Sequence, residues 1–180
     1  RPWQQRLAFL PDGDLFVKIR EGKVSAVTDQ IERFTENGIL LKSGKELEAD
    51  VIVTATGFNL SVLGEIPFSL DGKAIDWSDT VTWRGMMFTG VPNLVWIFGY
   101  IRASWTLRVD LVADFVCKML NSMEANQQRS VTVELRPHEQ GSERLPWIPE
   151  DDFNAGYLLR GVDRLPRGTT GEEWHHTQNY

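Results

Sequence analysis

The sequence has 180 residues, of which 42% are hydrophobic and 24% are charged, and its formal net charge is −6. This hydrophobic fraction supports a packed core, and the length suits one domain or parts of two. Acidic and basic residues are mixed along the chain, which argues against a nucleic-acid partner because phosphate binding needs a basic patch. Cys117 is the only cysteine, so no disulfide can form within the chain, as expected of a cytoplasmic protein. No apolar run reaches the roughly 18–20 residues of a transmembrane helix.

The first predicted elements are a short helix and an antiparallel meander. Residues 14–21 carry an apolar face of Leu15, Phe16 and Ile19, and Gly22 follows as a helix stop. An Asn-Gly pair between two apolar runs is typical of a hairpin turn. The strands of the meander are predicted over residues 24–28, 31–35, 39–42 and 47–54.

Residues 51–53, Val-Ile-Val, are the centre of the last of these strands. A run of β-branched residues without alternation predicts a strand that is covered on both faces. The Thr-Ala-Thr-Gly that follows has little side-chain bulk, so another backbone or a flat cofactor can approach closely, and Gly57 can adopt a positive φ. The residues alone therefore predict a strand-to-loop crossing in an α/β protein.

The next stretch is predicted to hold short strands and then one long helix. A hairpin is expected about an Asp-Gly turn at residues 71–72, followed by strands over residues 81–87 and 94–98. Residues 105–123 show apolar side chains at helical spacing, and Ser104 is the expected N-cap. Cys117 is expected to pack inertly on the apolar side of this helix.

The C-terminal stretch is predicted to be irregular. A polar linker leads to one more strand over residues 131–135, and prolines and turn residues dominate from residue 136 onward. The paired histidines at residues 175–176 have no second His or Cys cluster to complete a metal site, so we expect no metal. Four aromatic residues are expected to anchor this tail against another part of the protein, namely Trp147, Tyr157, Trp174 and Tyr180.

The string DVIVTATGF at residues 50–58 resembles a segment of flavoproteins with two dinucleotide-binding domains, and is most similar to flavin-containing and Baeyer–Villiger monooxygenases. Three further segments resemble the same family in the same order: RPWQQRLAFLPDGDLFVKIREGKV, GVPNLVWIFGYIRASWTLRVDLVADFVCKML, and FNAGYLLRGVDRLPRG with HHTQNY. The last of them resembles the subgroup that includes mycobacterial ethionamide-activating monooxygenases. The resemblance implies an oxidoreductase with a Rossmann-type α/β fold that uses FAD and NADPH.

The sequence lacks the G-x-G-x-x-G turns with which this family holds its two dinucleotides. The resemblance therefore implies a C-terminal part, α+β in itself, whose N-terminal half is missing. Residues 1–57 would end the NADPH-binding domain, residues 58–125 would belong to the FAD-binding domain, and residues 126–180 would form the tail. We expect the isolated chain to be inactive.

The resemblance also suggests site residues. Arg6 falls where Baeyer–Villiger enzymes place an arginine over the flavin. A guanidinium keeps its charge at neutral pH, so it can hold the anionic peroxyflavin that forms from reduced flavin and O₂. The ATG segment implies that Thr54, Thr56, Gly57 and Phe58 lie beside the two cofactors.

The start of the long helix is the other site that the resemblance implies. Its free N–H groups would face the pyrimidine end of the isoalloxazine and favour the anionic reduced flavin. Ser104, Thr106 and Leu107 are then cofactor-binding residues, and Trp105 lines the substrate side.

The family resemblance leaves several functions open. NADPH-reduced FAD and O₂ would insert oxygen into a ketone, or oxidise a sulfur or nitrogen substrate. A pyridine nucleotide–disulfide reductase is a rival, although it needs a cysteine pair that this chain lacks. The other rival is a non-catalytic binding or assembly module, which would expose apolar patches and could form a homodimer.

Overall fold

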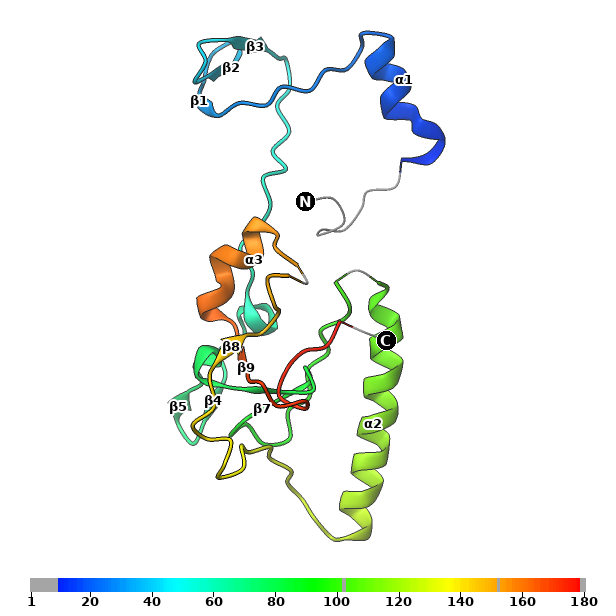
Figure 1. Ribbon diagram of the computed structural model, residues 1–180, viewed down its shortest axis with the longest axis vertical. Coiled ribbons are helices and arrows are strands. Elements are labelled where there is room, and N and C mark those ends of the chain that lie inside the picture. Colours follow the sequence, from blue (N-terminus) through cyan, green and yellow to red (C-terminus); the bar gives the residue numbers. More distant parts are fainter. Residues whose placement is uncertain (1–9, 102, 152, 179–180) are drawn as a thin grey trace. The chain divides into compact units, whose positions relative to one another are not determined.

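The computed structural model describes residues 10–101, 103–151 and 153–178. The chain divides into two compact units, whose described parts are residues 10–57 and residues 58–178 (Figure 1). Arg6 and Tyr180, which the sequence analysis singled out, lie outside the described residues. No helix in the part of the chain that the structure describes is long and apolar enough to cross a membrane.

The smaller unit contains the predicted helix and meander. The 3-10 turn η1 (Pro11–Gly13) leads into α1 (Asp14–Arg20), which ends close to the predicted position. Three antiparallel strands follow in the order β1-β2-β3, with bounds Ile31–Phe34, Gly38–Leu41 and Glu46–Glu48. A Cβ at Gly38 would overlap the Leu47 carbonyl oxygen on the neighbouring strand, so only glycine fits this close approach. The strand predicted over residues 24–28 is wrong, since that stretch has no regular structure.

The buried strand predicted over residues 51–53 is also wrong for this structure. The segment has no sheet partner among the described residues, and Val51 and Val53 are 79% and 84% exposed. A strand covered on both faces needs neighbours for its backbone N–H and C=O groups and a layer on each face. The described residues supply neither, so the apolar run remains extended and exposed.

The larger unit begins with the 3-10 turn η2 (Val62–Glu65) and two tight hairpins. The predicted hairpin is confirmed as β4 (Ser69–Leu70) and β5 (Lys73–Ala74). After the 3-10 turn η3 (Trp77–Asp79), β6 (Thr82–Trp83) pairs with β7 (Met87–Phe88). A turn with positive φ at Arg84 and Gly85 thus splits the single strand predicted over residues 81–87, because two such φ angles in succession reverse the chain.

Two further predicted strands are extended segments rather than strands. The Trp96 N–H donates to the Met86 carbonyl oxygen, but residues 94–98 form no ladder. Residues 131–135 contribute an isolated bridge between Val133 and Thr89. Half-buried side chains of both segments, among them Ile97 and Val133, pack against the core cluster around Met87.

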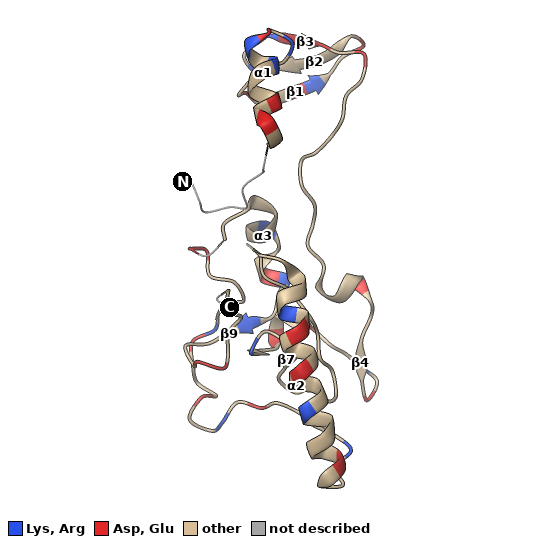
Figure 2. Ribbon diagram, turned by 90° about the vertical axis from the view of Figure 1, so that its right-hand side faces the viewer, with Lys and Arg blue, Asp and Glu red and all other residues tan. Residues whose placement is uncertain are grey.

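The long helix is confirmed as α2 (Trp105–Ala125). Val112 packs with Met86 and Met87 in a cluster that Phe115 also contacts. Charged residues follow one another along the opposite side of the helix (Figure 2), where Lys118 and Asp114 form an ion pair of 2.6 Å. Cys117 is exposed, so its predicted packing role is wrong.

The C-terminal stretch is made of short elements, and it supplies much of the core. These elements are β8 (Leu145–Pro146), α3 (Gly156–Gly161), the 3-10 turn η4 (Val162–Arg164) and β9 (Arg167–Gly168), and β8 pairs with β9. Trp147 and Trp174 are 1% and 3% exposed, and Trp147 belongs to the main core cluster with Phe88. These two tryptophans therefore anchor the stretch within its own unit, whereas the sequence analysis expected them to contact another part of the protein.

Candidate functional site: an aromatic cavity at the start of the long helix

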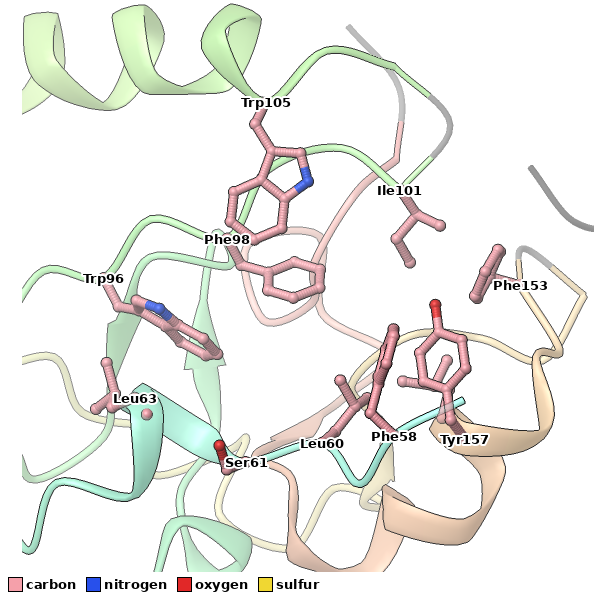
Figure 3. Close-up of a pocket in the computed structure, with 12 residues that line it drawn as sticks. Phe58, Leu60, Ser61, Leu63, Trp96, Phe98, Ile101, Trp105, Phe153 and Tyr157 are labelled. Carbon is pink, nitrogen blue, oxygen red and sulfur yellow. The ribbon is translucent and has the colours of Figure 1, made fainter. Parts of the chain in front are cut away.

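The larger unit contains an apolar cavity of about 680 Å³ (Figure 3). Three stretches of the chain build it: the segment after the inter-unit boundary, the segment that leads into α2, and the start of α3. The residues that line it are Phe58, Leu60, Ser61, Leu63, Gly64, Trp96, Phe98, Ile101, Trp105, Phe153, Tyr157 and Leu158. A volume of this size suits a small organic molecule.

Aromatic rings in contact with one another form the walls. The Phe98 ring lies 5.0 Å from that of Trp105, and 4.7 Å from the buried ring of Trp147. Across the cavity, the rings of Phe58 and Tyr157 lie 4.7 Å apart. Aromatic side chains have few rotatable bonds and tilted pairs lock them further, so the walls are preorganised.

Among the described lining residues, the polar groups are few. None of the described lining residues carries a charge. The hydroxyls of Ser61 and Tyr157 and the indole nitrogens of Trp96 and Trp105 are the side-chain polar atoms in view (Figure 3). A charged molecule would lose its hydration here without a counter-charge, whereas an uncharged flat ring would gain contacts on several sides.

This lining fits part of FAD and excludes another part. The uncharged aromatic surface suits the isoalloxazine ring, or a substrate beside it. The pyrophosphate does not fit, because a phosphate pair needs free N–H groups in a glycine-rich turn or basic side chains. The described lining residues include no basic side chain and no glycine-rich turn, so the phosphates would have to be held elsewhere.

The start of α2 lies at the cavity. Ser104 occupies the N-cap position with extended backbone angles, but its side chain makes no capping hydrogen bond. Its hydroxyl instead lies 2.7 Å from that of Thr106. Side chains therefore leave the first N–H groups of the helix uncapped, next to the cavity that Trp105 enters, and these groups favour an electron-rich partner.

The structure places the sequence-predicted residues in three groups. Phe58 and Trp105 line the cavity together. Ser104, Thr106 and Leu107 lie exposed around the helix start. Thr54, Thr56 and Gly57 belong to the smaller unit, where they are exposed, and Arg6 lies outside the described residues.

Sequence reasoning missed several lining residues, chiefly Phe98, Phe153 and Tyr157. Phe153 and Tyr157 follow the i, i+4 spacing that places side chains on one face of a helical turn, and their rings lie 6.1 Å apart. This spacing could have predicted that the two rings share a face, but the tail was predicted to be irregular.

His176 lies directly behind the cavity wall and is 1% exposed. Its Nε2 lies 3.2 Å from the Phe98 carbonyl oxygen. Burial, with the cation of Arg108 beside it, lowers the pKa of His176 to about 4. The imidazole is therefore neutral at physiological pH. No group of three potential metal ligands occurs among the described residues, and the paired histidines have separate hydrogen-bond partners.

Comparison with curated proteins gives close relatives over nearly the whole chain. The FAD-containing monooxygenase EthA of Mycobacterium tuberculosis is 49% identical over 179 residues, which are 99% of this chain and 36% of the relative. EthA of Mycolicibacterium smegmatis is 45% identical over 99% of this chain and 35% of its own length. By sequence, this chain is a homologue of the FAD-containing monooxygenases.

A relative from Acinetobacter agrees with this assignment. AlmA, named a probable FAD-binding monooxygenase, is 43% identical over 99% of this chain and 35% of its own length. The chain thus spans about a third of the length of these relatives. No family model and no solved structure matches it.

Proposed function

We propose that this chain is the C-terminal, flavin-side part of an FAD- and NADPH-dependent monooxygenase of the Baeyer–Villiger type, and that the aromatic cavity receives its substrate. The observation that carries the proposal is the 49% identity with an FAD-containing monooxygenase over 99% of the chain. The uncharged aromatic lining of the cavity supports it, since that lining accepts a flat ring system.

The residues of this chain would serve the reaction by binding and orienting the flavin ring and the substrate. Bound reduced flavin supplies the activation of O₂ and the transfer of one oxygen atom to a ketone, or to a sulfur or nitrogen atom. Phe58 and Trp105 would contact the flavin ring or the substrate, and the N–H groups at the start of α2 would stabilise negative charge on the ring. The apolar walls would exclude water, which protects a reactive oxygen donor from premature loss.

Arg6 has a separate role in the proposal. Its guanidinium would supply a permanent positive charge near the flavin and stabilise the negative charge that develops as oxygen attacks a carbonyl carbon. An electron-rich sulfur attacks the oxygen donor itself and develops no such charge on a carbonyl. Arg6→Ala should therefore impair ketone oxidation more than sulfide oxidation, and Arg6→Lys should retain part of the ketone activity.

A chimera provides the direct test. The corresponding segment of M. tuberculosis EthA is replaced by this chain, flavin retention is read from the visible spectrum after desalting, and NADPH-dependent oxidation of a methyl aryl sulfide and a methyl aryl ketone is followed. We expect retained flavin and oxygenated product. A folded chimera that retains flavin and oxidises NADPH but forms no oxygenated product from either compound would overturn the proposal.

The isolated chain gives a second measurement. Addition of FAD followed by desalting should leave no visible flavin absorbance, because the described residues offer no pyrophosphate site. The rival assignment, a non-catalytic assembly module, draws support from the exposed Val51 and Val53. A chimera with monooxygenase activity, together with a monomeric isolated chain in light scattering, would exclude that assignment.

A further inference from the structure

The last described residues of the chain lie against the segment that forms one wall of the cavity. His176 Nε2 lies 3.2 Å from the carbonyl oxygen of Phe98. Ile101 lies three residues further along this wall, and its N–H donates to Gln178 Oε1 over 2.8 Å. Phe98 and Ile101 both line the cavity, whereas His176 and Gln178 do not. Two side chains from one short stretch thus hold both ends of the wall segment, residues 98–101.

The hydrogen bonds define a single protonation state. Gln178 Nε2 lies 2.6 Å from His176 Nδ1. An amide nitrogen donates and cannot accept, so Nδ1 is the unprotonated ring nitrogen, and Nε2 carries the proton that the Phe98 carbonyl accepts. The Gln178 orientation agrees, because its oxygen already accepts from Ile101. Three hydrogen bonds therefore run in one direction, from the Ile101 N–H through Gln178 and His176 to the Phe98 carbonyl.

Packing holds the imidazole in this position. Its ring meets those of Phe98 and Trp147 edge-on, with centroids 5.5 Å and 5.4 Å away. A Cβ at Gly85 would overlap its Cδ2 atom, so the β6–β7 turn approaches the ring as closely as a backbone can. His176 therefore supports the Phe98 ring from behind, while Trp105 contacts that ring on the cavity side.

The charged and titratable groups near His176 disfavour its protonation. Arg108 of α2 donates to the carbonyls of Thr177 and Arg84, and it lies over the Tyr100 ring, 5.3 Å from its centroid. His175, the neighbour in sequence, also disfavours a positive charge on His176. A carboxylate in the same stretch, Glu173, is paired with Arg136 at 2.6 Å. A protonated His176 would also present an N–H to the amide group of Gln178, which breaks the network.

We propose that His176 and Gln178 are positioning residues for the cavity: they hold residues 98–101 so that Phe98 and Ile101 meet the molecule bound there. The inference rests on the proposed function, because it takes the cavity as the substrate site. It assigns the C-terminal stretch two tasks, since α3 supplies one wall directly and the residues after β9 brace another.

The test uses the 180-residue chain and acetophenone, a neutral aromatic ketone, as the probe. Its dissociation constant is measured by changes in tryptophan fluorescence for the wild type, Gln178→Ala and His176→Gln. The matched control is Thr177→Ala, since Thr177 is exposed and only its backbone carbonyl is bonded to Arg108. We expect Gln178→Ala to weaken binding about tenfold, as the loss of a partly buried hydrogen-bond partner does. His176→Gln can still donate to the Phe98 carbonyl, so it should lose less.

Gln178→Glu gives a readout that general destabilisation does not predict. The carboxylate still accepts from the Ile101 N–H, but it favours a proton on His176 Nδ1. We expect it to raise the pKa of His176 by more than one unit in an NMR titration, as an adjacent opposite charge does. Probe binding should then persist to lower pH than in Gln178→Ala. An unchanged His176 titration in Gln178→Glu would overturn the proposed network.

The outcomes separate this proposal from the proposed function. Wild-type affinity in both Gln178→Ala and His176→Gln overturns the positioning role alone. Failure of the wild-type chain to bind the probe overturns the cavity as a site, while the activity of the chimera still decides the monooxygenase assignment. If Gln178→Ala fails to fold, the Gln178→Glu titration and the His176→Gln affinity decide the question.

Discussion

The imidazole of His176 and the carbonyl of Phe98 meet across 78 residues of sequence, with Nε2 3.2 Å from the oxygen. This bond joins the end of the described chain to the segment before α2. The contact explains why a stretch of short elements is ordered: its side chains are core residues, and its polar groups bond to the cavity wall. Stability and the shape of the cavity therefore depend on the same residues.

Stability should depend on pH through His176. Its pKa is about 4 in the folded chain and 6.5 ordinarily. Between these values the unfolded state binds the proton first, so stability is complete above about pH 6.5, falls as the pH drops towards 4, and levels off below. The loss should be on the order of 3 kcal/mol. Urea unfolding at several pH values measures it. His176→Gln should remove this pH-dependent part of the stability, whereas His138→Gln, a change at an exposed position, should keep it. If the free energy of unfolding depends on pH equally in both variants, the assignment to His176 is contradicted.

Gly99→Ala should displace the Trp105 ring. Gly99 is buried, and a Cβ there would overlap the indole. Overpacking of this kind costs about 1–3 kcal/mol, and here it also moves the residue at the start of α2. We expect weaker probe binding and a shifted Trp105 fluorescence. Gly141→Ala is the control, because no other atom lies within 4 Å of its added Cβ. Similar effects from both substitutions would show that Gly99 has no special contact.

Trp147→Ala should be severely destabilising, by about 3–5 kcal/mol, because it empties the centre of the core. Trp147 stacks on Trp96 at 4.9 Å and is 1% exposed. Trp147→Phe should cost much less, since it keeps an aromatic ring and removes a buried indole N–H that has no hydrogen-bond partner among the described residues. Thermal unfolding compares the two. Equal losses would mean that a phenyl ring does not restore the packing that the indole provides.

Cys117 should react with a thiol reagent in the folded chain without denaturant, because it is exposed on α2. Its modification should leave probe binding unchanged, as Cys117 is absent from the cavity lining. The measurement is the number of thiols per chain that react with the reagent under native conditions. Protection of the thiol until urea is added would mean that this helix face is covered in solution, for example by a second copy of the chain.

Local features of the sequence predicted the long helix and one hairpin. Regular apolar spacing indicated α2, and the Asp-Gly pair indicated the β4–β5 hairpin. Phe58 and Trp105, which family resemblance selected, line one cavity in the structure. Backbone angles and side-chain spacing within a few residues are enough for such predictions.

Long-range packing decided the rest. The Val-Ile-Val run at residues 51–53 has the composition of a buried strand, yet burial needs partners that the described chain does not provide. Trp147 and His176 lie among prolines and turn residues, yet they are buried, because partners far away in sequence cover them. The sequence by itself determined the helix, the turns and the family. Only the tertiary structure decided which side chains form the cavity and its brace, since burial and hydrogen bonding depend on neighbours that sequence spacing does not show.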